Sequence, residues 1–174
     1  MIFGNGKNQS KGETGFTLIE LIVVMAIVAT LVTLLMPVLG KGLARGRGAY
    51  CLNNLRQLGL AIEAYADDNA GLLPNAEPLP SVPIDAANPL PRIRDVLWLY
   101  VSKSESLFKC PNDAARFPTE GTSYEWNFLY GGRDLTRLRG TKSPLMYDYD
   151  NVHDDRGGSG TKNILFADGH VSAP

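Results

Sequence analysis

The chain has 174 residues, a formal net charge of −1 and a hydrophobic fraction of 44%. The near-neutral charge excludes a bulk electrostatic attraction to nucleic acid. The average composition hides three regions: a polar, glycine-rich start, a strongly apolar segment, and a loop-rich remainder that holds most of the prolines. We therefore predict a leader peptide at residues 1–15, a transmembrane segment at 16–36, an amphipathic helical stem at 37–70 and a globular domain at 71–174.

The apolar segment, residues 16–36, is interrupted by only four polar residues: Thr17, Glu20, Thr30 and Thr33. At about 1.5 Å per helical residue it spans roughly 31 Å, which is enough to cross the core of a bilayer. It is too long for the apolar core of a cleaved secretory signal, and a plain signal anchor does not account for Glu20. A carboxylate at membrane depth is costly unless it is paired, so Glu20 marks a functional site.

A small basic cluster, Lys41, Arg45 and Arg47, follows the apolar segment. It lacks the interleaved aromatic residues of a nucleic-acid surface, and we interpret it as a solvated stem or one that faces lipid headgroups. Because Lys7 and Lys11 precede the segment, the distribution of positive charge favours neither orientation in a membrane.

The stem carries an apolar stripe. Its members recur at steps of four, three, four and three residues: Cys51, Leu55, Leu58, Ile62 and Tyr65. This spacing predicts an amphipathic helix that ends near Asn69 and packs on the C-terminal domain. Pro37 and the glycines between residues 40 and 48 weaken a helix, so we expect a continuous helix with a soft, kinked or locally melted zone at 37–48.

The remainder of the chain predicts a small antiparallel sheet. Residues 75–91 are rich in Pro, Ala and Asn and read as a long loop. Strand candidates follow at residues 122–130, 145–150 and 162–167, and Asp168-Gly169 predicts a two-residue hairpin turn into residues 170–172. The fold class is therefore α+β, with a long helix packed on three or four strands.

The run GFTLIELIVVMAIVATL resembles the N-terminal signature of type IV pilins and type II secretion pseudopilins. In that family a prepilin peptidase cuts after the glycine, here Gly15, and methylates the new N-terminal residue, here Phe16. The fifth mature residue is a glutamate, here Glu20. The resemblance implies a pilin-like fold and a structural subunit rather than an enzyme. It also implies a single pass through the bacterial inner membrane, with the C-terminal domain periplasmic or extracellular.

The same resemblance implies the partners. They are further copies of the chain in a filament, other pilin-like subunits, the prepilin peptidase and methyltransferase, the inner-membrane assembly platform and lipid. Cleavage after Gly15 would create a cationic amine on Phe16, which is a natural partner for Glu20 in its own or a neighbouring subunit. Two alternatives stay open: Glu20 reaching only to the membrane interface, and a membrane-tethered calcium- or glycan-binding module that does not polymerise.

Two cysteines, Cys51 and Cys110, are compatible with one disulfide in an exported domain or with two buried free thiols in the cytosol. Three segments of the sequence resemble a subgroup of pilin-like proteins with paired cysteines: CLNNLRQLGLAIEAYADDNAGLLP, FKCPND and SYEWN. That resemblance implies a bridge between Cys51 and Cys110.

An acidic cluster occupies eight residues near the C-terminus. It contains four carboxylates, those of Asp148, Asp150, Asp154 and Asp155. Carboxylates are oxygen ligands that Ca²⁺ prefers, and major pseudopilins carry calcium in a C-terminal loop. The spacing does not match an EF-hand, so a solvated acidic loop is the competing interpretation. We predict no other cofactor.

The two histidines give little support to catalysis, because no nucleophile motif accompanies His153 or His170. The ending ILFADGHV resembles the C-terminal motif of the same pilin-like subgroup, in which a histidine precedes the Asp-Gly pair at a short fixed spacing. Here fourteen residues separate His153 from Asp168. We expect His170 to be an exposed hairpin residue.

Overall fold

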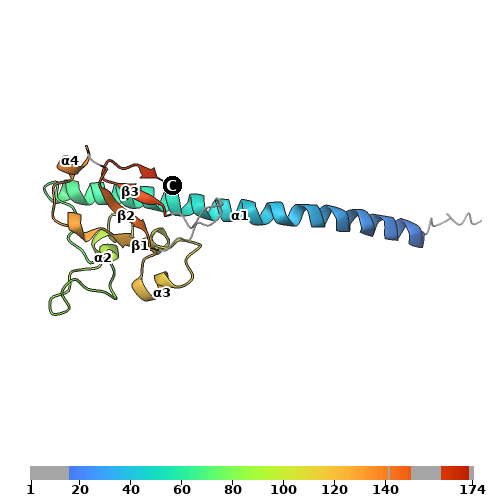
Figure 1. Ribbon diagram of the computed structural model, residues 1–174, viewed down its shortest axis with the longest axis horizontal. Helices are drawn as coiled ribbons and strands as arrows, with labels where there is room; N and C mark the ends of the chain where they lie inside the picture. The colour runs from blue at the N-terminus through green and yellow to red at the C-terminus, as the bar shows by residue number, and fades with distance from the viewer. Residues whose placement is uncertain (1–15, 141, 150–161, 173–174) are drawn as a thin grey trace, which may run out of the picture. The chain divides into compact units, whose positions relative to one another are not determined.

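The computed structural model describes residues 16–140, 142–149 and 162–172 (Figure 1). A 51-residue helix, α1 (Leu18–Asp68), is followed by short elements. In chain order these are α2 (Ile93–Leu97), the 3-10 helix η1 (Glu105–Phe108), α3 (Arg116–Glu120), β1 (Tyr124–Trp126), the 3-10 helix η2 (Phe128–Tyr130), α4 (Leu135–Leu138), β2 (Pro144–Asp148), β3 (Ile164–Phe166) and β4 (Val171–Ser172). The chain divides into two compact units, residues 1–40 and 41–174, and each is described by itself.

The helix α1 contains Pro37 and remains helical on both sides of it. The backbone of residues 37–48, where we expected a soft zone, is helical throughout. A proline removes one hydrogen bond from a helix, but its neighbours keep theirs, so the local loss does not have to interrupt the backbone. The predicted end near Asn69 is confirmed within one residue, and Gly71 follows with a positive φ of 80°.

The apolar stripe of the stem forms the core of the second unit. Cys51, Leu55 and Leu58 are completely buried and Ile62 is 1% exposed, whereas Leu60 is 65% exposed. The stripe therefore packs against the rest of the domain, as its spacing predicted, and the helix face that carries Leu60 is exposed.

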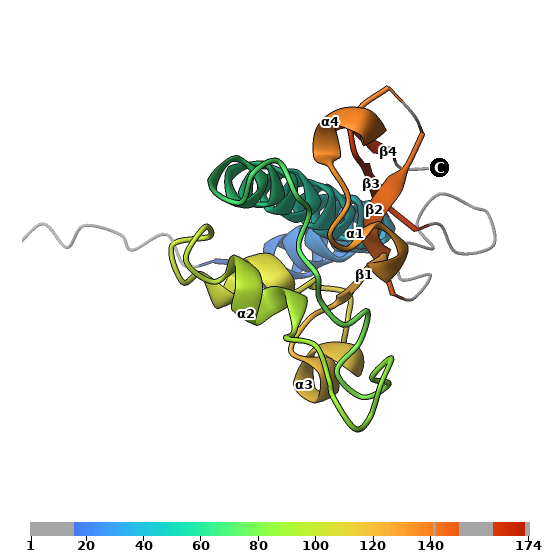
Figure 2. The same cartoon turned by 90° about the vertical axis from the view of Figure 1, so that its left-hand side faces the viewer.

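The four strands form one antiparallel sheet in the order β1-β2-β3-β4, and Figure 2 shows it beside α1. The register pairs Trp126 with Met146, Met146 with Leu165, and Leu165 with Val171. This row contacts α1 closely at Gly59, because a Cβ atom added there would lie 2.9 Å from Leu165 Cδ1. Glycine at position 59 thus allows the sheet to approach the helix.

Two details of the sheet correct the sequence-based expectation. The first strand ends at Trp126 rather than near Tyr130, because the Asn127 side chain accepts a hydrogen bond from Leu129 N and starts η2. The hydrogen bond from Phe166 N to His170 O closes the hairpin between β3 and β4, so its loop consists of the three residues 167–169, and Gly169 N donates to Phe166 O within it. Only Gly169, of the pair we expected to form the turn, has a positive φ. This is the three-residue loop with glycine in the left-handed position.

Candidate functional site

The start of α1 is closed by a reciprocal pair of hydrogen bonds between Thr17 and Glu20. Thr17 N and Thr17 Oγ1 donate to Glu20 Oε2 at 2.8 and 2.7 Å, and Glu20 N donates to Thr17 Oγ1 at 3.4 Å. Thr17 is the residue before the helix, and its carbonyl accepts from Leu21 N. This is a capping box, in which the side chains at both ends satisfy backbone donors that a helix start leaves free.

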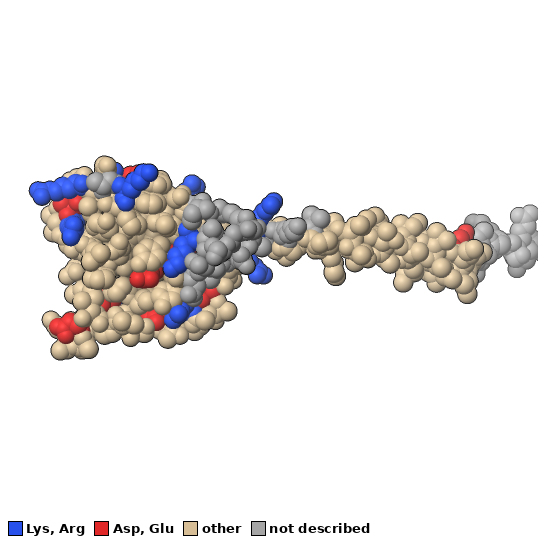
Figure 3. Space-filling model, in the orientation of Figure 1, with Lys and Arg blue, Asp and Glu red and all other residues tan. Residues whose placement is uncertain are grey.

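The capping box lies against apolar surface. Glu20 and four apolar side chains line a shallow hollow of about 340 Å³; the apolar residues are Phe16, Ile19, Val23 and Val24. Glu20 is the only charged residue between positions 16 and 37, and Figure 3 shows a long helical stretch that is almost entirely uncharged on the face in view. The carboxylate is therefore held at the helix start, next to apolar side chains that the described residues leave exposed.

Every described side chain from Phe16 to Pro37 is exposed. The stretch Leu18–Pro37 is long and apolar enough to cross a membrane, by length and composition. Its two remaining hydroxyls are satisfied within the helix, since Thr30 Oγ1 and Thr33 Oγ1 each donate at 2.8 Å to the carbonyl four residues earlier. These bonds remove the cost of placing hydroxyls in lipid.

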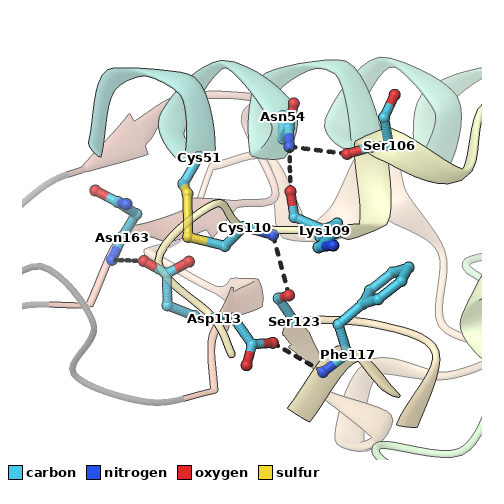
Figure 4. Close-up of a disulfide and its surroundings, with 10 residues drawn as sticks. Cys51, Asn54, Ser106, Lys109, Cys110, Asp113, Phe117, Ser123 and Asn163 are labelled. Atoms are coloured by element: carbon cyan, nitrogen blue, oxygen red, sulfur yellow. Dashed lines mark hydrogen bonds between the residues drawn. A yellow bond between two sulfur atoms is a disulfide. The ribbon is translucent and has the colours of Figure 1, made fainter. Parts of the chain in front are cut away.

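The second unit contains the predicted disulfide between Cys51 and Cys110, whose Cα atoms lie 5.2 Å apart (Figure 4). Next to it the buried Asn54 of α1 donates through Nδ2 to Lys109 O at 3.0 Å and Ser106 O at 3.3 Å. Cys110 N donates to Ser123 Oγ at 3.0 Å. The covalent bridge and these hydrogen bonds fasten the segment 106–110 to the helix.

Asp113 extends this polar network and was missed by the sequence analysis. Its carboxylate accepts hydrogen bonds from three backbone N–H groups, those of Ala115, Arg116 and Phe117. Figure 4 shows the bond from Phe117. Burial alone would raise the pKa of Asp113, but the hydrogen bonds from Ser123 and from the backbone outweigh it and lower the pKa overall. The only sequence signal was an aspartate after Pro-Asn, which is typical of a turn.

The proposed calcium ligands are only partly described. Asp148 is completely buried at the end of β2, and its Oδ2 accepts Asn163 N at 2.8 Å. Asp150, Asp154 and Asp155 lie outside the described residues, as do Gly15 and His153. Within the described part of the chain, no group of three or more His, Cys, Asp or Glu side chains is placed to hold a metal. The calcium site stays a prediction.

His170 lies on the surface after the β3–β4 turn and is half exposed, as expected. Its Nδ1 contacts Asp168 Oδ1 at 2.5 Å, and its ring stacks on Phe166 with centroids 4.4 Å apart. The hydrogen bonds from His170 lower the pKa of Asp168. These contacts fasten the turn and bring no described nucleophile to the histidine.

Comparison with known protein families gives one match. The prokaryotic N-terminal methylation motif matches residues 10–36, which include Gly15, Phe16 and Glu20. The chain thus carries the N-terminal motif of the type IV pilin and pseudopilin family, and its long apolar helix with a small four-stranded antiparallel sheet agrees with that family's α+β fold. Comparisons with curated proteins and with solved structures found no match.

Proposed function

We propose that the chain is a prepilin-like structural subunit of a type II secretion pseudopilus or a type IV pilus. It is cut after Gly15, methylated on Phe16, held in the bacterial inner membrane by residues 16–37, and assembled through α1 with its globular part in the periplasm or outside the cell. The observation that carries the proposal is Glu20, the lone charge of an exposed apolar helix within a methylation motif.

The geometry at the helix start supports a role for Glu20 in assembly. In the uncut chain its carboxylate already accepts Thr17 N–H, one residue after the position where the new amine would form. A charged amine on Phe16 offers a stronger, charge-assisted hydrogen bond than a backbone amide. In a filament the amine of a neighbouring copy offers the same bond, which would fix the register between subunits.

The capping box also makes the role of the charge testable. Glu20→Gln keeps an acceptor for Thr17 N but removes the charge, whereas Glu20→Ala removes both. We expect both variants to lose filament assembly in a strain that supplies the peptidase and assembly platform, measured by electron microscopy and by sedimentation of sheared filaments. Thr17→Ala keeps the charge and should still assemble. If Glu20→Gln assembles as well as the wild type, the hydrogen bonds of the capping box are sufficient for assembly, and the proposed pairing of the Glu20 charge with the amine is wrong.

Processing has an independent test. The mature chain should have the mass of residues 16–174 plus one methyl group, measured by mass spectrometry of the membrane fraction. Gly15→Ala should leave the leader attached and abolish assembly. A Gly15→Ala protein that stays full length yet still forms filaments would contradict the proposal and favour a membrane-tethered module that never polymerises.

A further inference from the structure

Two buried glutamates hold the loop at residues 78–91 through hydrogen bonds. Glu77, 2% exposed, accepts Ile84 N and Leu90 N, each at 2.8 Å. Glu120, also 2% exposed, accepts Ser81 N at 2.9 Å and the Ser81 hydroxyl. A loop held at three points and rich in proline has little conformational entropy left to lose on binding.

Between these anchors the loop exposes apolar side chains. Val82 is 65% and Ile84 is 50% exposed, and the loop projects away from α1 and the sheet in Figure 2. The segment 78–91 has a single charged residue, Asp85, which is also exposed. We call residues 82–85 the apolar tip.

A second apolar feature of the same unit is a groove between α1 and the segment after α2. Leu60, Ala61, Val101 and Leu107 supply its apolar lining, and Gln57, Tyr100 and Ser102 complete it. Its volume of about 270 Å³ is below the 300–1,000 Å³ typical of small-molecule sites. A groove of this size suits one or two protruding side chains better than a free ligand.

The backbone beside the groove is strained. Ser102 and Lys103 both have positive φ, 51° and 61°, in succession. Such a conformation costs residues other than glycine roughly 1 kcal/mol or more each, and strain of this kind gathers at functional sites. The turn leaves Lys103 exposed next to the lining residue Ser102, so a cation follows the groove lining along the chain, whereas the apolar tip contains an anion.

We propose that the apolar tip of one copy docks in the groove of a neighbouring copy, with Asp85 facing the neighbour's Lys103. A helical filament needs a heterologous contact, in which two different patches of the same chain meet. The tip and the groove supply two such patches, each with exposed apolar surface, and the charges of Asp85 and Lys103 are opposite. The inference rests on the proposed function, because only an assembled filament brings the two patches together.

The test uses two full-length variants expressed together, Val82→Cys and Gln57→Cys, so that only a contact between copies can join them. In filaments we expect a disulfide-linked dimer at least about tenfold above the pair Ala114→Cys and Gln57→Cys, because contact raises the effective concentration of the thiols. Ala114 is an exposed residue outside both patches. Intact filaments without this excess would overturn the docking and leave the proposed function standing, whereas failure of the wild type to form filaments overturns both.

A charge exchange separates contact from folding. Asp85→Lys and Lys103→Asp should each lower the cross-linked fraction several-fold, and the double variant should restore it. Asp85 Oδ1 also accepts Ala87 N at 2.9 Å within the loop, so Asp85→Asn serves as the control that keeps this acceptor. Single charge variants that cross-link as well as the cysteine pair without charge changes, or a double charge variant as weak as the singles, would contradict the pairing.

Discussion

The two ends of α1 share one helical backbone but differ in what covers them. From Leu18 to Pro37 every side chain is exposed, whereas from Cys51 to Ala66 buried and exposed positions alternate with the period of a helix. The first part is apolar on all sides, and the second has a single apolar stripe. The contrast teaches that the second part buries its stripe within the chain, while the first needs a partner from outside it.

The size of the exposed apolar surface gives this contrast an energetic meaning. Each large apolar side chain left in water forgoes about 1.5–3 kcal/mol of burial, and soluble monomers rarely expose so long a patch. In the proposed function, lipid and neighbouring helices supply that burial for residues 18–37. Substitutions in the two parts should therefore change different properties: assembly and membrane retention for the first, and stability of the globular unit for the second.

The largest stability effect should come from the disulfide. Cys51 and Cys110 are 59 residues apart, and removing a bridge that closes a loop of this length costs about 4 kcal/mol in the chain-entropy model. The double variant Cys51→Ser, Cys110→Ser should lower the free energy of unfolding by that amount, measured in detergent by urea titration and Trp fluorescence. The buried Trp126 reports on the core. An unchanged midpoint would show that the hydrogen bonds of Asn54 alone hold the segment 106–110.

The next effect distinguishes two leucines that lie two residues apart. Leu58 is completely buried and Leu60 is 65% exposed. Leu58→Ala should destabilise the globular unit by about 3 kcal/mol, because it leaves a cavity, whereas Leu60→Ala should stay within about 0.5 kcal/mol of the wild type. Val28→Ala, in the exposed apolar part, is the control from the other half of α1 and should not move the same urea midpoint. Equal losses for Leu58 and Leu60 would contradict the placement of the stripe.

The sequence predicted the features that depend on periodicity and on strong local signals. The stripe from Cys51 to Ile62 followed from helical spacing, and the antiparallel sheet followed from three apolar runs and an Asp-Gly turn. The methylation motif followed from Gly15, Phe16 and Glu20. These patterns are local, so a single chain displays them without its fold.

The features that escaped prediction depend on contacts between distant segments. A glycine inside a helix weakens it, and only the close approach of Leu165 to Gly59 accounts for a glycine there. Asn54 is polar, yet it is 1% exposed, because the carbonyl groups of Ser106 and Lys109 accept hydrogen bonds from its side chain. Nothing near Glu77 or Glu120 in sequence predicts that their carboxylates bind one loop. The length of the β3–β4 turn escaped because Asp-Gly serves both two- and three-residue hairpins.

The smallest effect concerns Asp113, whose charge is stabilised by Ser123 and three backbone N–H groups. Because the pKa of Asp113 is lower in the folded than in the unfolded chain, its contribution is fully present above the unfolded value of about 3.9 and is lost as the pH falls through the lower folded value. Asp113→Asn should therefore cost about 1 kcal/mol at pH 7, since the hydrogen bonds from Ala115 N and Arg116 N become neutral ones and the new amide NH₂ group cannot accept from Phe117 N.

The difference between wild type and Asp113→Asn should shrink as the pH falls below about 4, because the wild-type carboxyl also becomes neutral there. Urea titrations from pH 7 to pH 2 measure it, and Asp67→Asn, at an exposed position of α1, should give no such trend. A difference in the free energy of unfolding between wild type and Asp113→Asn that stays constant down to pH 2 would mean that the shape of the side chain at position 113 matters and its charge does not. The effect belongs wholly to the globular unit, so assembly variants at Glu20 should leave it unchanged.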